Sequence, residues 1–202
     1  MQEMLPVVKA LWQGDYAHDG EYWKFPLATS VPKPIQQPHP PIWVAARAPI
    51  TYDYAVKNQC NILSWPLTRP MSEVETYLSR LQNALEDNPG QERPIFAAMR
   101  HTCVYDREEE WMVPVEAAMR QLGQFENLFK NMGGVNNGFP AMIDLATIEN
   151  RDESNPQMLH ENLMFGTPKE VIAKLKIYDE LGGDHFTYYA RPGLGLKDKK
   201  RS

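Results

Sequence analysis

The chain of 202 residues is 43% hydrophobic and 23% charged, and its formal net charge is −5. These are ordinary values for one globular domain, and a pI near 5.6 argues against nucleic acid as a partner, because phosphate binding needs a basic face. No apolar run approaches the roughly 18 residues of a membrane span, and the N-terminus lacks a basic, apolar leader. Cys60 and Cys103 both fall in predicted strands, so no structural disulfide is expected. We therefore expect a soluble, cytoplasmic, single domain over residues 1–202, with neither nucleic acid nor a membrane as partner.

The first forty residues are predicted to hold one helix and a long proline-rich connection. Residues 1–13 place apolar side chains at helical spacing. Residues 14–41 have no helical period, and so long a connection is expected to be functional or pinned by packing, for example as a short hairpin around Asp19-Gly20. This segment either wraps the outside of the fold or forms a lid over the mouth of a site. The apolar helix positions are Leu5, Val8, Leu11 and Trp12, and the aromatic residues predicted to pin the segment are Tyr16, Tyr22, Trp23 and Phe25.

The centre of the chain has the pattern of a strand, a helix and a second strand. Residues 42–46 form a short apolar run of β-forming residues, and residues 60–65 form another. Between them, a helix is predicted to begin at Pro49 or Thr51 and to end at Asn58-Gln59. Strands joined in this way are parallel, with a right-handed crossover. The inward positions of the helix are Tyr52, Ala55 and Val56.

The same alternation continues to the end of the chain. Residues 166–181 begin a helix with Thr167, Pro168 and Glu170, which is the pattern of a capping box with proline at the first helical position. Residues 131–165 form an irregular insertion with turn signals and a short helix over 141–147. The other predicted elements are a helix over 72–86 capped by Ser72, a strand over 94–105, a helix over 106–130 that Pro114 bends or interrupts, and a strand over 185–190.

Four parallel strands that alternate with helices predict an α/β fold whose strand C-termini meet on one face, where such folds carry their sites. The turn from Arg47 to Thr51 feeds a helix N-terminus, whose N–H groups and dipole favour an anion. The sequence has no P-loop, GxGxxG, GxSxG or CxxC pattern, and its histidines show no metal-ligand spacing. The residues at the strand ends are Ala46-Arg47, Ser64-Trp65, Val104-Tyr105, and Tyr188-Tyr189 with Arg191 beyond.

Three stretches of sequence carry a combined signature. The first is Gly14-Asp15-Tyr16 with HDGEYW at 18–23 and PKPIQQPHPP at 32–41. The second is WVAARAPITYDYAVKNQCNILSW at 43–65, and the third is GTPKEV at 166–171 with LGGDHF at 181–186. In this order they resemble the bacterial luciferase-like flavin-dependent monooxygenases over nearly the whole chain. The N-terminal half of that family has no counterpart here.

The resemblance implies the C-terminal half of a (β/α)8 TIM barrel with about four parallel strands. It also implies that residues 131–165 are a substrate-facing insertion, with a mobile loop as the alternative. Four strands cannot close an eight-stranded barrel, so two sheet edges would be bare. A separate chain with the missing N-terminal half, a homo-oligomer of half-barrels, or the rest of a longer protein would cover them. Because Met1 falls inside a predicted helix, we favour a fragment or a truncated gene model.

The family resemblance also implies a cofactor, FMN or alternatively coenzyme F420, or none bound in a truncated chain. The flavin phosphate would lie at the turn of Ala46, Arg47, Ala48 and Thr51. Ser64 would donate a hydrogen bond beside the flavin, and Trp65 would wall its ring. The alternatives are a surface cation at Arg47 and a core tryptophan on the barrel rim at Trp65.

Substrate contacts are expected from the remaining strand ends. Tyr105, Tyr188, Tyr189 and Arg191 would border the substrate pocket, and the alternative is a plain strand end with a solvated arginine. His101 is expected to be a satisfied core or rim residue rather than a base. Catalytic residues are not assigned, because in the family several groups at the reactive edge of the flavin come from the absent half.

The resemblance implies a monooxygenase in which reduced flavin and O₂ oxygenate a small organic substrate. A flavin reductase is the expected partner, and the identity of the substrate does not follow from the sequence. The alternative is a non-catalytic half-barrel that acts as a flavin-binding or oligomerising module.

Overall fold

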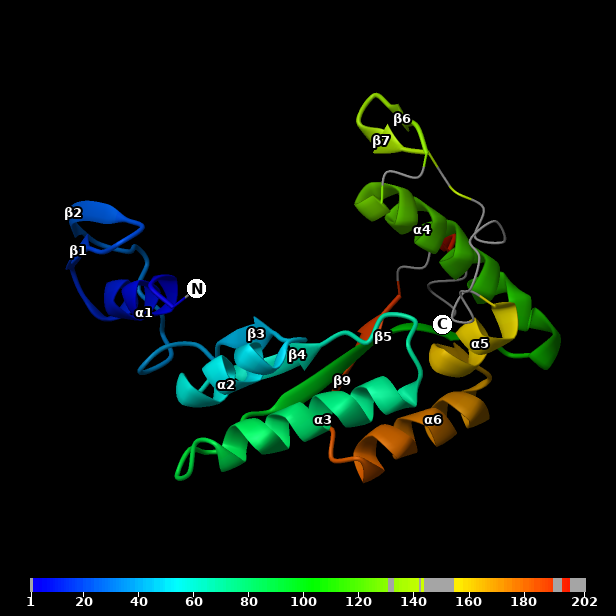
Figure 1. Cartoon of the computed structure of the whole chain (residues 1–202). Helices are drawn as coiled ribbons and strands as arrows, with labels where there is room; N and C mark the ends of the chain where they lie inside the picture. Colours follow the sequence, from blue (N-terminus) through cyan, green and yellow to red (C-terminus); the bar gives the residue numbers. More distant parts are fainter. Residues whose placement is uncertain (1, 131–132, 142, 144–154, 191–193, 197–202) are drawn as a thin grey trace. The chain divides into compact units, whose positions relative to one another are not determined.

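The fold is given by a computed structural model that describes residues 2–130, 133–141, 143, 155–190 and 194–196 (Figure 1). The chain divides into two compact units, residues 1–42 and residues 43–202. The expectation of a single domain over the whole chain stays a prediction. Over the described ranges, no helix combines the length and the apolar character that crossing a membrane requires.

The first unit consists of a helix and a hairpin. Helix α1 spans Met4–Gln13, and strands β1 (Tyr16–Asp19) and β2 (Lys24–Ala28) pair antiparallel. Asp19 lies opposite Lys24 and forms an ion pair with it. The predicted hairpin around Asp19-Gly20 is therefore confirmed.

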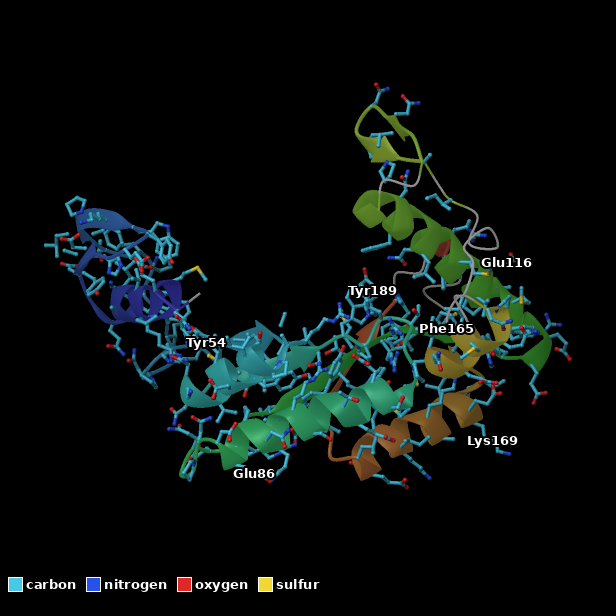
Figure 2. All side chains as sticks on the ribbon, viewed as in Figure 1. Tyr54, Glu86, Glu116, Phe165, Lys169 and Tyr189 are labelled. Carbon is cyan, nitrogen blue, oxygen red and sulfur yellow. The ribbon has the colours of Figure 1, made fainter. Side chains whose placement is uncertain are left out.

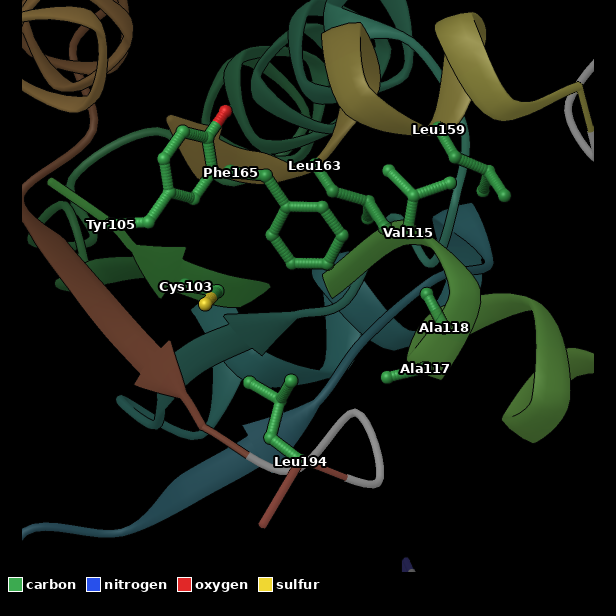
Figure 3. Packing of buried hydrophobic residues seen from close by; sticks show 9 residues of the cluster. All are labelled: Cys103, Tyr105, Val115, Ala117, Ala118, Leu159, Leu163, Phe165 and Leu194. Carbon is green, nitrogen blue, oxygen red and sulfur yellow. The ribbon is translucent and has the colours of Figure 1, made fainter. Parts of the chain in front are cut away.

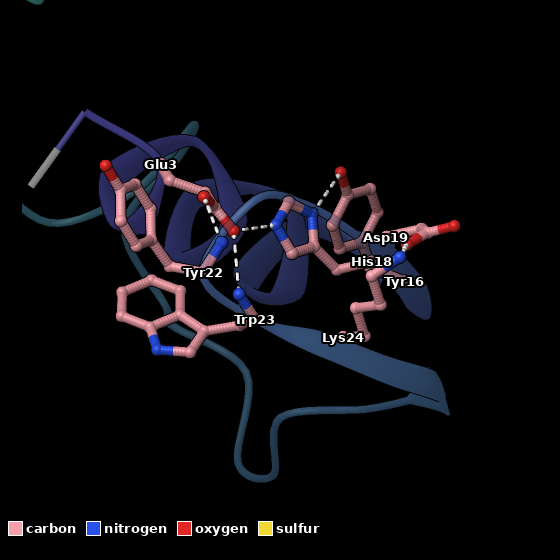
Figure 4. Close-up of polar contacts among 7 residues, drawn as sticks. All are labelled: Glu3, Tyr16, His18, Asp19, Tyr22, Trp23 and Lys24. Atoms are coloured by element: carbon pink, nitrogen blue, oxygen red, sulfur yellow. Dashed lines mark hydrogen bonds and ion pairs between the residues drawn. The ribbon is translucent and has the colours of Figure 1, made fainter.

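The carboxylate of Glu3 joins the helix to the hairpin (Figure 4). It accepts a hydrogen bond from His18 Nε2 at 2.8 Å and from the backbone N–H groups of Tyr22 and Trp23 at 3.0 and 3.1 Å. The bond from His18 is the largest cause that lowers the pKa of Glu3. The side chains of Tyr22 and Trp23 are 73% and 44% exposed, so the prediction that their rings pin the segment is wrong. Their backbone, not their aromatic surface, is held.

The proline-rich segment of the first unit is tied back to α1 by Lys33. Its ammonium group donates to the carbonyls of Leu11 and Gly14 at 2.7 and 3.0 Å, at the end of the helix. A cation at a helix C-terminus satisfies carbonyls that have no partner within the helix. Tyr16 and Phe25 do pack, edge to face with their ring centroids 6.4 Å apart.

The second unit is organised around a parallel sheet. Strands β3 (Trp43–Ala45), β4 (Asn61–Ser64) and β5 (Phe96–Val104) pair in chain order. Strand β9 (His185–Tyr189), which was predicted over 185–190, pairs parallel with residues 97–101 of β5. The sequence did not indicate β8 (Met164–Gly166), which pairs with residues 102–104 of the same strand. The helices between the strands are α2 (Pro49–Lys57), α3 (Met71–Glu86) and α6 (Pro168–Glu180).

Successive residues of these strands point to opposite faces of the sheet. Val44, Ile62 and Ser64 are buried beneath α2 and α3, and Arg100 reaches Tyr178 of α6. We call this side the covered face, and Figure 1 shows α3 and α6 running along it. The other side is the open face, which carries Trp43, Ala45, Asn61, Leu63, Met99, His101, His185 and Tyr189.

The sheet curves toward its open face. Trp43 of β3 and His185 of β9 lie on strands that are separated by two others in the pairing order. Their rings nevertheless stack, with centroids 6.0 Å apart and an interplanar angle of 28°. Trp43 stays 40% exposed. A parallel sheet that curls inward in this way has the geometry of an arc of a barrel.

A separate core covers the far end of β5. Helix α4 (Met112–Lys130) and helix α5 (Pro156–Asn162) pack over it (Figure 3). A short 3₁₀ turn over Glu108–Trp111 precedes α4, so Pro114 falls in the first turn of α4 and does not interrupt it. The buried residues of this core are Cys103, Tyr105, Val115, Ala117, Ala118, Leu159, Leu163, Phe165 and Leu194.

The helix starts confirm one capping prediction and correct another. At α6 the Glu170 carboxylate accepts from the Thr167 backbone N–H at 2.7 Å and from its hydroxyl at 2.8 Å, and the capping box is present. At α3 the N-cap is Pro70, and Ser72 lies inside the first turn, so its predicted role is wrong. Pro70 has no side-chain acceptor, so no side chain caps the start of α3.

The described parts of the insertion over 131–165 contain elements that the sequence did not indicate. Strands β6 (Val135–Asn136) and β7 (Phe139–Pro140) form a small hairpin, and α5 and β8 close the segment. Asn155 caps α5 by accepting from the backbone N–H of Gln157 at 2.9 Å. The helix predicted over 141–147 falls largely on residues outside the described ranges.

Candidate functional site

An aromatic cluster on the open face joins the C-terminal ends of three strands. Trp65 follows β4, and His101 of β5 lies opposite Tyr189 of β9. The ring centroids of His101 and Tyr189 are 4.7 Å apart, and Trp65 meets each of them at 5.6 Å with an interplanar angle of 69°. Such tilted and edge-to-face contacts are favourable for aromatic pairs. Figure 2 labels Tyr189 at the end of its strand.

Two buried polar atoms of this cluster have no hydrogen-bond partner among the described residues: Trp65 Nε1 and His101 Nδ1. Native proteins satisfy nearly all such atoms, and leaving one unpaired costs about 1–3 kcal/mol. Burial, with the charge of Arg100 as a second cause, lowers the pKa of His101 to about 4. The imidazole is therefore neutral at pH 7. An indole donor and a neutral imidazole nitrogen together fit the polar atoms of a flat ligand.

The turn from Arg47 to Thr51 leads into α2, as predicted. The helix begins at Pro49, its N-cap residue Ala48 provides no side-chain acceptor, and its first turn has no acidic residue. Arg47 is exposed, and Arg80 of α3 donates to its carbonyl oxygen. A helix start without a capping group, beside two arginines, fits an anion such as a phosphate.

Ser64 stabilises this turn from the covered face of the sheet. Its side chain is fully buried and donates to the carbonyl of Ala46 at 2.9 Å. Because that bond uses its single proton, Ser64 accepts the hydrogen bond from the Tyr52 hydroxyl at 2.7 Å. Burial raises the pKa of Tyr52 to about 12, so the phenol keeps the proton that it donates. This corrects the expectation that Ser64 donates to the flavin: its hydroxyl holds the end of β3.

Tyr105 lies outside the aromatic cluster. It is 5% exposed within the core beneath α4 and α5, and its hydroxyl lies 2.6 Å from His160 Nε2. Burial raises the pKa of Tyr105 to about 12. Burial is also the main cause that lowers the pKa of His160, and the positive charge of Lys174 is the second. Tyr105 is therefore the donor and neutral His160 the acceptor. This corrects the expected substrate contact at Tyr105, because its polar atom is already paired.

Tyr188 and Tyr189 point to opposite faces, because they are neighbours on one strand. Tyr188 shares the covered face with Arg100, its pairing partner, whereas Tyr189 joins the open-face cluster. The two tyrosines therefore cannot border one pocket on the same face, and a substrate contact stays a prediction for Tyr189. Arg191 lies outside the described residues.

The sequence predicts that His101 is a satisfied core or rim residue. It is buried, but its Nδ1 has no hydrogen-bond partner among the described residues, so the expectation that it is satisfied is wrong. Strand alternation places it on the same face as Cys103 and Tyr105, and its position near the end of β5 brings it level with Tyr189. Within the described ranges, no group of three or more histidine, cysteine, aspartate or glutamate side chains is placed to hold a metal ion.

The chain belongs to the luciferase-like monooxygenase family. The model of that family matches residues 1–185, which is most of the chain. The predicted family and the predicted half of a TIM barrel are therefore confirmed.

Among relatives, the chain is 38% identical over 202 residues to the oxygenase component of a flavin-dependent trigonelline monooxygenase from Acinetobacter baylyi. The match covers 100% of this chain and 56% of that protein. The chain thus spans about half the length of the curated relative that it matches.

Solved structures show the same fold at low identity. The monooxygenase RslO1 from Streptomyces bottropensis has a TM-score of 0.63 and 21% identity, over 99% of this chain and 56% of that one. The oxygenating constituent of 3,6-diketocamphane monooxygenase from Pseudomonas putida, solved with FMN, has a TM-score of 0.65 and 17% identity, over 94% and 55%. An F420-dependent secondary alcohol dehydrogenase has a TM-score of 0.62 and 17% identity, over 91% and 53%.

Proposed function

We propose that the protein formed with this chain is a flavin-dependent monooxygenase, and that this chain supplies one wall of the flavin and substrate site. The observation that carries the proposal is the cluster of Trp65, His101 and Tyr189 at the strand ends, with two buried polar atoms left for a ligand. In a parallel α/β fold, this is the end at which ligands bind. Membership of the luciferase-like family supports the same conclusion.

FMN is the cofactor we propose. Its phosphate would lie at the uncapped start of α2, beside Arg47, Ala48 and Thr51, with Ala46 at the preceding strand end. The relative from Acinetobacter baylyi is flavin-dependent, and one solved neighbour contains FMN. Coenzyme F420 is the alternative, because another neighbour uses it. When bound, the reduced flavin supplies the electrons for the reaction with O₂.

The residues of this chain would bind and orient rather than transfer protons. Trp65 and Tyr189 offer ring faces and edges that exclude water from a flat ligand. His101 is held without a charge, so it can exchange a hydrogen bond with a ligand atom while adding no charge to the pocket. Arg47 would provide the fixed positive charge for the phosphate.

The substrate we propose is a small, flat organic molecule, because the wall that it meets is aromatic. Trigonelline is the first compound to test, since the 38% identical relative acts on it. That relative is named as an oxygenase component. We therefore propose a flavin reductase as the partner that delivers reduced flavin.

The test is titration of the chain with FMN, followed by quenching of flavin fluorescence. Arg47→Ala should weaken binding about tenfold, which corresponds to one charge-assisted contact of roughly 1.4 kcal/mol. Lys176→Ala removes an exposed charge of the same sign from α6 and should leave the affinity unchanged. Equal affinity of all three proteins would remove the phosphate assignment.

A second candidate is a non-catalytic half-barrel that binds flavin or oligomerises through its open face. The exposure of Trp43, at 40%, and of His185 on that face favours it. Oxygen uptake with FMN, a reductase and trigonelline separates the two. Uptake above the reductase background supports the enzyme. FMN binding without uptake, in a protein that gel filtration shows to be an oligomer, supports the module.

A further inference from the structure

Arg100 is a buried cation on the covered face of the sheet. Its side chain is 0% exposed, and its Nε donates to the Tyr178 hydroxyl of α6 at 2.7 Å. Over the described ranges, no carboxylate forms an ion pair with it. A buried charge without a counter-ion is costly unless hydrogen bonds stabilise it, and an apolar residue would fill the same space at a lower cost. The hydrogen bonds of this side chain are therefore informative.

The other partners of Arg100 all belong to one loop, residues 66–70, which lies between Trp65 and α3. Every backbone carbonyl of this loop accepts a hydrogen bond, and three of the five accept it from Arg100. Arg100 donates to Leu67 at 3.0 Å, Arg69 at 2.6 Å and Pro70 at 3.3 Å, while Pro66 accepts from the Arg69 N–H at 2.9 Å and Thr68 accepts from Asn162 at 2.9 Å.

The loop needs this support because its backbone is strained. Leu67 has a φ of 53°, in the left-handed region that residues other than glycine rarely adopt. Such a conformation persists only where the surroundings determine it. The planar guanidinium can reach several carbonyls at fixed angles, which a flexible ammonium group cannot do.

The same loop begins directly after Trp65, and Arg100 is the sequence neighbour of His101. We propose that Arg100 is a positioning residue: by fixing loop 66–70, it sets the Trp65 indole against His101 and Tyr189. Its charge has a second effect across the strand, because it opposes protonation of His101. Arg100 acts on His101 from the opposite face of the same strand, and Tyr189 of β9 lies against the imidazole ring on the open face. Only the identity of the ligand rests on the function proposed above.

Three variants separate the two effects of Arg100. Arg100→Met removes both the planar set of N–H donors and the positive charge, whereas Arg100→Lys keeps the charge but loses the planar set of donors. Tyr178→Phe is the matched control, because it removes a partner of Arg100 that does not belong to the loop. The readouts are nuclear Overhauser contacts between the rings of Trp65 and Tyr189 and the titration midpoint of His101, both by NMR. The Trp65 indole resonance is assigned through Trp65→Phe.

We expect Arg100→Lys to lose the contacts between Trp65 and Tyr189 while the His101 midpoint stays close to that of the parent chain. Arg100→Met should lose the contacts and also raise the midpoint by about one pH unit. Tyr178→Phe should change neither. Contacts that survive in both Arg100 variants would overturn the proposal, because Arg100 would then be needed only for stability.

If Arg100→Met does not fold, Asn162→Ala takes its place. This change frees one loop carbonyl, Thr68, without touching a charge. We expect the contacts between Trp65 and Tyr189 to weaken and the His101 midpoint to stay the same. Unchanged contacts, together with unchanged contacts in Arg100→Lys, would contradict the positioning role. A parent chain that binds no FMN would remove the proposed function but would leave this test intact.

Discussion

The two faces of the central sheet carry the same strands but differ in how their polar groups are satisfied. On the covered face, Arg100 donates four hydrogen bonds within the chain, and the Ser64 hydroxyl has a donor and an acceptor as partners. On the open face, Trp65 Nε1 and His101 Nδ1 have no partner among the described residues. The Tyr77 hydroxyl is the exception on the covered side. The difference agrees with our proposal that a ligand binds on the open face, whereas the polar groups of the covered face hold the fold together.

The largest expected contrast compares two neighbours on β4. Ile62 is fully buried on the covered face, whereas Leu63 is half-buried on the open face. Ile62→Ala should lower the free energy of unfolding by about 4 kcal/mol, and Leu63→Ala by about 1 kcal/mol, because only the first opens a cavity in a packed core. Denaturant unfolding measures both. Equal losses would mean that the two faces are equally packed.

The acid stability of the chain tests whether His101 is buried without a charge. Its folded pKa of about 4 lies below the usual histidine value of 6.5, so the unfolded chain binds more protons between these values. The stability that His101 contributes is complete above pH 6.5 and is lost as the pH falls toward 4. In His101→Phe, the loss of unfolding free energy between pH 6.5 and pH 4 should be smaller by up to about 3 kcal/mol. The exposed His185 is the matched control, and His185→Gln should leave the pH profile as it is.

Ser64→Ala tests the polar network of the covered face. It should lower the free energy of unfolding by about 2 kcal/mol, because the Tyr52 hydroxyl and the Ala46 carbonyl lose their buried partner. Ser79→Ala is the control, since Ser79 sits on an exposed part of α3 and bonds only to Glu75 within its own helix. Thermal unfolding that fails to separate the two variants would contradict the network.

The smallest effect is expected at the start of α6. Glu170→Gln keeps the shape of the capping box but removes the charge that the Thr167 N–H and hydroxyl stabilise. The loss should be about 0.5–1 kcal/mol. The hydrogen bonds from the Thr167 N–H and hydroxyl hold the pKa of Glu170 below its usual value. The difference between variant and parent should therefore shrink as the pH falls through that pKa, which unfolding at pH 7 and pH 3 measures.

Sequence patterns sufficed for the four parallel strands β3, β4, β5 and β9, because such strands are short apolar runs separated by strong helix signals. Side chains alternate between the two faces of a strand, and this rule, applied along the predicted strand, would have placed His101 on the open face. Residues 164–166 were missed because three residues carry too little periodicity to indicate β8.

The hydrogen-bond partners of the polar side chains were harder to predict from the sequence than the strands. Arg100 has no local signal, because its hydrogen bonds reach a loop 30 to 33 residues earlier and a helix 78 residues later. Tyr105 looked like a strand-end residue open to substrate, and only the position of α5 shows that His160 already pairs with it. Such contacts depend on tertiary packing, which a single sequence does not report.

The central claim is that a flavin lies against the open-face cluster at the strand ends. Titration of the chain with FMN, followed by NMR at the Trp65 indole N–H and the His101 imidazole, tests it most directly. We expect both resonances to shift with a common dissociation constant for FMN, and we expect this constant to rise in Arg47→Ala. FMN that binds while leaving both resonances in place, or that fails to bind at all, would contradict it.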